Sequence, residues 1–106
     1  MGTPARILIV DDEEAIRFSL EELLTRDGHQ VVAVESGERA LAALADQRFD
    51  LVLLDLKLEG MGGLEVLSAL RQQTLDTAVI VLTAHGSMET AIQALRQGAH
   101  DYLLKP

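Results

Sequence analysis

Five short apolar runs alternate with longer amphipathic segments along the chain. The runs, rich in Leu, Val and Ile, lie at 7–10, 31–34, 51–54, 78–82 and 102–104. Continuous apolar runs of this length are typical of parallel strands that are covered on both faces. The pattern therefore predicts five strands, and the first, third and fourth runs have the most apolar composition.

The four intervening segments have apolar residues at helical spacing. Their predicted inner faces are Ile16, Leu20, Leu23 and Leu24; Ala40, Leu41, Leu44 and Ala45; Leu64, Val66, Leu67 and Leu70; and Ala91, Ile92 and Leu95. Ser36 can cap the second helix, Ser87 marks the start of the fourth, and Gly28 and Gly98 lie where the first and fourth end. Strict alternation of strands and helices predicts an α/β domain with a parallel sheet, right-handed crossovers and helices on both faces.

The composition narrows the class of protein. The chain has 106 residues, the length of one small domain, and a net charge of −8. Such a charge repels phosphate backbones and argues against nucleic-acid binding by this segment. With no Cys there is no thiol chemistry and no disulfide, as expected in the cytoplasm. No apolar run approaches the length of a membrane span.

Polar residues follow the predicted strands where each one ends. Asp11 and Asp12 come after the first strand, Asp55 after the third, Thr83 after the fourth and Lys105 after the fifth. In an open parallel sheet, ligands bind beyond the carboxyl ends of the strands. We therefore expect these side chains to gather at one edge of the sheet.

Some of these residues also have simpler explanations. Asp11 with Glu14 resembles a capping box, and Asp12 with Glu13 would suit a helix N-terminus. Lys105 could be a solvated lysine at a strand end. Asp55 is different, because no helical pattern begins for several residues after it.

Carboxylates that cluster without a cation repel one another, so a divalent metal is the economical explanation. Oxygen ligands favour Mg²⁺. Asp12 and Asp55 would be direct ligands, Asp11 would act mainly through water, and the backbone carbonyl of Lys57 could add an oxygen.

A carboxylate beside a metal can act as a nucleophile and form an aspartyl phosphate. Asp55 is the best candidate for this role. Lys105 could neutralise charge on the transferred phosphoryl group, and Thr83 could donate a hydrogen bond to one of its oxygens.

This set of residues, each after its own strand, resembles the receiver domain of two-component response regulators over essentially the whole chain. The resemblance implies a flavodoxin-like, doubly wound five-stranded sheet of order 2-1-3-4-5. It also implies that Asp55 accepts a phosphoryl group from a partner sensor histidine kinase with Mg²⁺ assistance, and that the Lys105–Pro106 bond is cis. The domain would be a regulatory phosphoacceptor that assists its own phosphorylation and dephosphorylation, not an enzyme.

The resemblance extends to a switch and to an output. Thr83 resembles the hydroxyl residue drawn toward the phosphoryl group, and Tyr102 resembles the aromatic residue that rotates inward behind it. The alternative for Tyr102 is an edge-strand aromatic that covers the sheet. Segments 82–87 and 98–102 are similar to receivers of nitrogen-regulation enhancer-binding activators, which implies an output module for transcription activation outside this segment.

The chain departs from the family pattern in two places. Glu59 replaces the usual Pro and Gly62 the frequent Asp in the loop after Asp55, from which we predict a mobile loop and altered phosphorylation kinetics. The receiver domain, residues 1–106, is also expected to be truncated before its fifth helix. Strands four and five would then expose apolar surface, which favours a homodimer or a swapped oligomer.

Two other functions remain open at this point. An Mg²⁺-dependent aspartyl-phosphate phosphohydrolase usually has a second Asp two residues after the nucleophile, where this chain has Lys57. A receiver-like interaction module that is never phosphorylated would have lost one of the acids, Thr83 or Lys105. His85 could tune the site or be a solvated loop residue, and His29 and His100 are expected at the surface.

Overall fold

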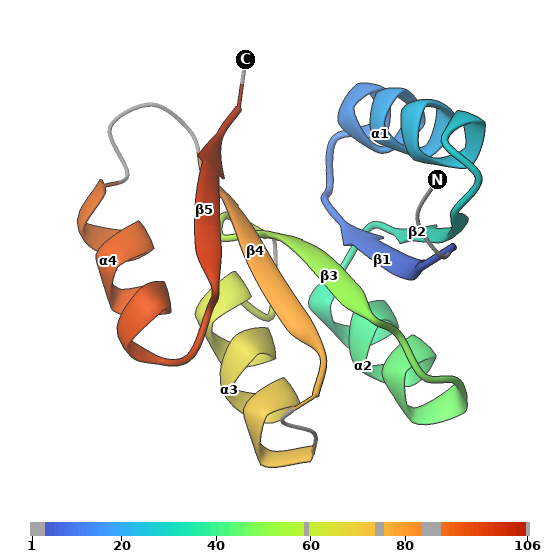
Figure 1. Cartoon of the computed structure of the whole chain (residues 1–106). Coiled ribbons are helices and arrows are strands. Elements are labelled where there is room, and N and C mark those ends of the chain that lie inside the picture. The colour runs from blue at the N-terminus through green and yellow to red at the C-terminus, as the bar shows by residue number, and fades with distance from the viewer. Residues whose placement is uncertain (1–3, 59, 74–75, 84–87, 106) are drawn as a thin grey trace.

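The computed structural model describes residues 4–58, 60–73, 76–83 and 88–105, and the structural statements below concern these residues. Strands and helices alternate along the chain (Figure 1). The elements are β1 (Arg6–Val10), α1 (Glu14–Arg26), β2 (Gln30–Val34), α2 (Gly37–Asp46), β3 (Leu51–Asp55), α3 (Gly63–Gln73), β4 (Ala78–Thr83), α4 (Met88–Arg96) and β5 (Asp101–Leu104). All five predicted strands are confirmed, with bounds that differ from the expected ones by no more than one residue at either end.

The strands form one parallel sheet of order β2-β1-β3-β4-β5. This is the flavodoxin-like order 2-1-3-4-5 that the resemblance implied. Because every strand runs in the same direction, the residues that follow the five strands share one edge of the sheet, which we call the carboxyl edge. The opposite edge, where the strands begin, is the amino edge.

Helices α2, α3 and α4 cover one face of the sheet, and α1 covers the other (Figure 1). On the larger face, Leu8 and Leu54 of the strands pack with Leu67 of α3, and all three are fully buried. Burial of one such side chain contributes roughly 1.5–3 kcal/mol. On the smaller face, Leu20 and Leu24 of α1 pack against the sheet.

The face covered by α1 is left partly open over β5. Leu103, which pairs with the core residue Leu82 of this face, is 52% exposed. Leu104, which shares the opposite face with Tyr102, is 56% exposed. The described residues contain four helices and no fifth. The predicted apolar exposure is confirmed on β5, but not on β4, where Leu82 is buried and Ile80 is half-buried. Oligomerisation through this surface remains a prediction.

The predicted inner face of α4 is right for Ala91 but wrong for Ile92 and Leu95. Ala91 and Ala94 are fully buried, whereas Ile92 and Leu95 are exposed. The helix turns its small side chains toward the sheet and leaves the larger ones outside. Hydrophobicity alone favoured the large residues, but α4 contacts the sheet through alanines, which allow a closer approach.

Two smaller corrections concern the other helices. Leu23 of α1 is 53% exposed and Ala45 of α2 is exposed, so neither belongs to the inner face predicted for it. The cap of α2 is confirmed, since the Ser36 hydroxyl accepts a hydrogen bond from the Arg39 amide. Ser87 lies outside the described residues. Within the described part of the chain, every helix is too short or too polar to span a bilayer.

Candidate functional site

Four polar residues meet at the carboxyl edge, as the sequence predicted. Asp11 follows β1, Asp55 ends β3, Thr83 ends β4, and Lys105 follows β5. Asp11, Asp55 and Thr83 are buried, and the Lys105 side chain is only 10% exposed. The Lys105 amide donates to the Thr83 carbonyl at 2.9 Å, which extends the pairing of β4 with β5 to the site.

Three carboxylates lie close enough to hold one cation. Asp11, Asp12 and Asp55 each present an oxygen, and these atoms lie within 4.8 Å of one another. Asp11 and Asp55 are buried and Asp12 is exposed, so the cluster opens to solvent on the Asp12 side. Asp11 Oδ2 is buried and accepts no hydrogen bond. This oxygen has an ion pair with Lys105 Nζ at 2.9 Å but no hydrogen bond, and with two further carboxylates beside it the cluster fits a hard divalent cation.

Asp11 does not cap α1. The N-cap of α1 is Glu13, whose side chain makes no capping hydrogen bond. Asp11 Oδ1 instead accepts from the Glu13 amide at 2.9 Å, and Arg17 Nη1 donates to the Asp11 carbonyl at 2.7 Å. The capping-box interpretation is therefore wrong, because these contacts fix Asp11 before the helix begins.

Both oxygens of Asp55 are held by donors. Oδ1 accepts from the Lys57 amide and Oδ2 from Lys105 Nζ, each at 2.9 Å. Burial raises the pKa of Asp55 above its ordinary value, the two hydrogen bonds oppose this rise, and the charge of Asp11 adds to it. The carboxylate is thus held in place, but its negative charge is not fully compensated.

Lys105 is not a solvated strand-end lysine. Its Nζ lies 2.9 Å from Asp11 Oδ2, 3.0 Å from Glu13 Oε1 and 2.9 Å from Asp55 Oδ2. The contact with Asp11 is an ion pair without hydrogen-bond geometry, whereas the other two are also hydrogen bonds. Burial alone would lower the pKa of Lys105, but the three carboxylates raise it above its usual range.

Gly63, the first residue of α3, allows the helix to begin directly behind Asp55. A Cβ at this position would lie 2.5 Å from the Asp55 carbonyl oxygen and 2.6 Å from Leu56 Cα, so only glycine fits. At Gly62 a Cβ would meet nothing within 4 Å, so steric crowding does not explain why this chain has Gly where the family often has Asp. Glu59 lies outside the described residues.

Some predicted site features remain partly or wholly untested. Tyr102 is half-buried and packs against the larger core cluster, which agrees with the covering role offered as its alternative. Lys57 is exposed, and its amide, not its carbonyl, has a defined contact at the site. His85 and the Lys105–Pro106 bond lie outside the described residues.

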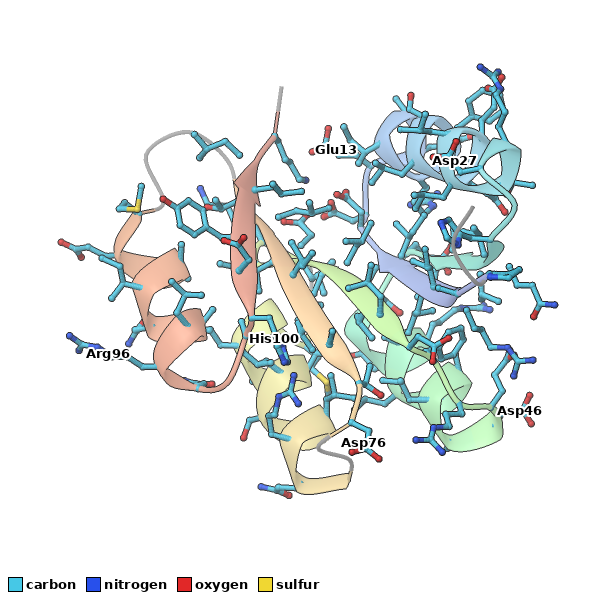
Figure 2. All side chains as sticks on the ribbon, viewed as in Figure 1. Glu13, Asp27, Asp46, Asp76, Arg96 and His100 are labelled. Atoms are coloured by element: carbon cyan, nitrogen blue, oxygen red, sulfur yellow. The ribbon has the colours of Figure 1, made fainter. Side chains whose placement is uncertain are left out.

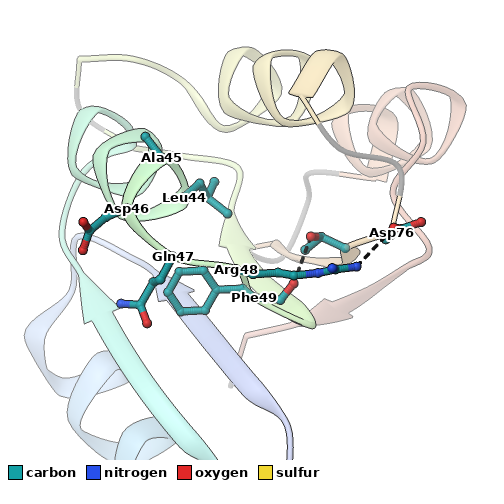
Figure 3. Close-up of a pocket in the computed structure, with 8 residues that line it drawn as sticks. Leu44, Ala45, Asp46, Gln47, Arg48, Phe49 and Asp76 are labelled. Carbon is teal, nitrogen blue, oxygen red and sulfur yellow. Dashed lines mark hydrogen bonds and ion pairs between the residues drawn. The ribbon is translucent and has the colours of Figure 1, made fainter.

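The other two histidines lie at the amino edge. His100 is exposed, as predicted, but His29 is half-buried. Each uses Nδ1 to accept a backbone hydrogen bond, His29 from the Ala5 amide and His100 from the Val79 amide. A pocket lies at the same edge, beside the ion pair of Arg48 with Asp76 (Figure 3). The acidic cluster lies at the opposite edge of the sheet.

Two residues at the carboxyl edge were missed by the sequence analysis. Glu13 was considered only as an acid at a helix N-terminus, yet it contacts Lys105, and Arg17 was not considered. No sequence signal pointed to this contact of Glu13, because a place at a helix N-terminus already explained the acid locally and Lys105 lies 92 positions away. No sequence signal identified Arg17 either.

Comparison with known proteins agrees with this geometry. Residues 7–106 match the family model described as the response regulator receiver domain. The chain is 42% identical over 102 residues to the response regulator protein FleR of Pseudomonas aeruginosa, covering 96% of this chain and 22% of FleR. It is 40% identical over 100 residues to the DNA-binding transcriptional regulator NtrC of Salmonella typhimurium, covering 94% of this chain and 21% of NtrC.

Solved structures give the same result. The receiver domain of NtrX from Brucella abortus superposes with a TM-score of 0.90 at 38% identity, covering 94% of this chain and 85% of that one. A response regulator receiver domain protein from Clostridium thermocellum superposes with a TM-score of 0.91 at 36% identity, covering 96% and 82%. The chain spans about a fifth of the length of the curated relatives FleR and NtrC. It belongs to the response regulator receiver domain family.

Proposed function

We propose that the domain is a phosphorylation-dependent switch in which Asp55 accepts a phosphoryl group from a partner sensor histidine kinase. The observation that carries this proposal is the position of the Asp55 carboxylate, buried between Lys105 Nζ at 2.9 Å and the acids Asp11 and Asp12. In the transfer, an Asp55 oxygen bonds to phosphorus while the bond from phosphorus to the donor breaks, and the donor group leaves with that electron pair.

The residues around Asp55 suit this transfer. Lys105 would neutralise negative charge on the transferred group, and Thr83, buried at the end of the neighbouring strand, would donate its hydroxyl to a phosphoryl oxygen. Asp11, Asp12, Asp55 and the Lys57 carbonyl would hold Mg²⁺, which when bound supplies charge neutralisation at the phosphoryl oxygens. The buried Asp11 Oδ2, which has an ion pair with Lys105 but no hydrogen bond, supports this assignment.

The phosphorylated state would be relayed to the surface formed by α4 and β5. Thr83 ends β4, and Val81 of β4 pairs with Tyr102 of β5. A shift of the Thr83 hydroxyl toward the phosphoryl group would therefore occur two residues from the β4 position that pairs with Tyr102. A phosphoryl group adds a charge of about −1.5 to −2 at pH 7, enough to bias a two-state element. The exposed Ile92 and Leu95 of α4 lie on the surface that would change.

The output would be control of transcription through a module outside this segment. NtrC is described as a DNA-binding transcriptional regulator, and the matched region is 21% of its length. The net charge of −8 makes direct DNA binding by the receiver itself unfavourable. The chain would therefore act on a partner domain, in the cytoplasm, and not on nucleic acid.

Mass spectrometry after incubation with acetyl phosphate and Mg²⁺ tests the proposal. We expect a base-labile mass increase of about 80 Da, one phosphoryl group, that is absent in Asp55→Asn. Asp46→Asn is the matched control, because it removes an exposed carboxylate on α2 and should leave the adduct unchanged. Omission of Mg²⁺ should strongly reduce the yield.

Other outcomes would contradict the proposal. Release of many equivalents of phosphate per protein would indicate a phosphohydrolase, for which Lys57 leaves no evident general acid beside the nucleophile. No adduct with acetyl phosphate, with other small phosphodonors or with a phosphorylated kinase would indicate an unphosphorylated interaction module.

A further inference from the structure

Glu13 is engaged in a contact that its position in the helix does not explain. It is the N-cap residue of α1, where a side chain normally accepts a hydrogen bond from the first turn, but Glu13 makes no such bond. Its carboxylate instead reaches Lys105 Nζ at 3.0 Å, from a residue 92 positions away in the sequence. Figure 2 shows Glu13 at the carboxyl edge, between α1 and the end of β5.

Lys105 has three donor hydrogens and three carboxylates around it. Asp11 and Asp55 are buried partners, whereas the Glu13 side chain is 59% exposed. Asp11 is fixed further by the Glu13 amide on Oδ1, and Asp55 by the Lys57 amide on Oδ1. Among these three contacts, the one with Glu13 therefore requires the least free energy to break, because only this side chain can move into water.

We propose that Glu13 is a positioning residue that holds Lys105 in the unphosphorylated state and competes with the incoming phosphoryl group for its ammonium. The inference rests on the proposed function. When Asp55 accepts a phosphoryl group, an oxygen of that group replaces the Glu13 carboxylate as the acceptor of a hydrogen bond from Lys105 Nζ. The Glu13 carboxylate then moves into solvent. No proton is transferred and no further bond is made or broken.

This competition has a directional consequence. The contact stabilises the starting state of phosphorylation and is absent once the phosphoryl group is in place. Its removal should therefore speed phosphorylation and leave the lifetime of the phosphorylated form unchanged. Since an exposed ion pair is weak, the expected acceleration is about two- to fivefold.

The test compares Glu13→Gln with Glu14→Gln. Glu14 is the adjacent exposed acid and has no side-chain contact with Lys105 among the described residues, so its variant removes the same charge from nearly the same place. Phosphorylation rates are measured at low acetyl phosphate and saturating Mg²⁺, at low and high salt, and hydrolysis is followed after donor removal. The Lys105 ammonium signal is recorded by ¹⁵N NMR in the unphosphorylated proteins.

We expect Glu13→Gln to move the Lys105 signal and to accelerate phosphorylation by about two- to fivefold at low salt, and we expect high salt to reduce this acceleration because it screens the exposed Glu13 carboxylate. Glu14→Gln should do neither. Equal acceleration by both variants, an unmoved Lys105 signal, or a change confined to hydrolysis would overturn the inference. A wild-type protein that forms no adduct would instead contradict the proposed function, so the two failures are distinguishable.

Discussion

The two edges of the sheet use polar groups in opposite ways. At the amino edge, Thr77 Oγ1 donates to the Phe49 carbonyl, Asp50 accepts from the Arg6 amide, and Arg48 pairs with Asp76 at the surface (Figure 3). The Thr77 contact is neutral, and the other two are exposed. At the carboxyl edge, a lysine and carboxylates are buried together, and Asp11 Oδ2 accepts no hydrogen bond.

The contacts at the amino edge stabilise the fold, whereas the buried charged groups at the carboxyl edge remain available for ligand binding and chemistry. A satisfied buried hydrogen bond lowers the free energy of the folded state and leaves nothing for a ligand to complete. A buried charge whose neighbouring carboxylate oxygen lacks a hydrogen bond is stable only because the surrounding fold supports it, and a cation or a phosphoryl group can relieve that cost. The predictions below test this distinction.

Replacement of Lys105 by Met should give the largest effect. It leaves Asp11 and Asp55 as buried charges without their shared cation, which we expect to lower the free energy of unfolding by about 3–5 kcal/mol at neutral pH without metal. Added Mg²⁺ should recover part of the loss. Urea unfolding with and without Mg²⁺ measures both.

The control for this variant is Lys57→Met at the same edge. Lys57 is exposed and its ammonium contacts no carboxylate among the described residues, so its loss should change stability by less than about 0.5 kcal/mol. Equal losses in the two variants would show that the carboxyl edge responds to net charge alone, and the comparison of the two edges would fail.

The sequence predicted the strands and the gathering of polar residues better than it predicted helix faces. The carboxyl ends of parallel strands lie at the same edge of a sheet, however the helices pack. The positions of Asp11, Asp55 and Thr83, each at the end of its own strand, were therefore enough to predict that they lie close together. The inward face of a helix depends on how closely it approaches the sheet, which hydrophobicity does not encode. Ile92 is exposed for this reason, although it is the most apolar residue of its helix.

The contact of Glu13 with Lys105 shows a second limit of sequence reasoning. The two residues lie 92 positions apart, and their meeting requires the full strand order, in which β5 lies at one end of the sheet and the acid-bearing loop follows β1. Local patterns assign Glu13 to a helix N-terminus. Its long-range partner becomes visible only when the sheet is assembled.

At the amino edge, Thr77→Val should have a smaller effect that is confined to stability. The substitution keeps the shape of the side chain but leaves the buried Phe49 carbonyl without its donor, at a cost of about 1–2 kcal/mol. Phosphorylation by acetyl phosphate should be unchanged. Thr25→Val on the exposed side of α1 is the control and should be nearly neutral in thermal unfolding. A slower phosphorylation rate in Thr77→Val would contradict the separation of the two edges.

The smallest expected effect is a pH-dependent gain in stability in Asp55→Asn. Burial raises the pKa of Asp55 above its ordinary 3.8, so between 3.8 and the raised pKa the unfolded chain gives up a proton that the folded protein keeps. The stability of the wild type therefore falls relative to Asn as the pH rises through this window. Below it, both states carry a neutral side chain and the difference should vanish.

Thermal unfolding in the presence of EDTA, from acidic to neutral pH, measures this difference. We expect Asp55→Asn to melt a few degrees higher than wild type at neutral pH, with the gain disappearing in acid, whereas the exposed Asp46→Asn should melt close to wild type at neutral pH. A variant that is less stable at neutral pH would mean that the hydrogen bond from Lys105 outweighs the burial of the Asp55 charge. The carboxyl edge would then be held together by the same kind of satisfied hydrogen bond as the amino edge. Asp11 Oδ2 would be the one described carboxylate oxygen of Asp11 and Asp55 at that edge without a hydrogen bond.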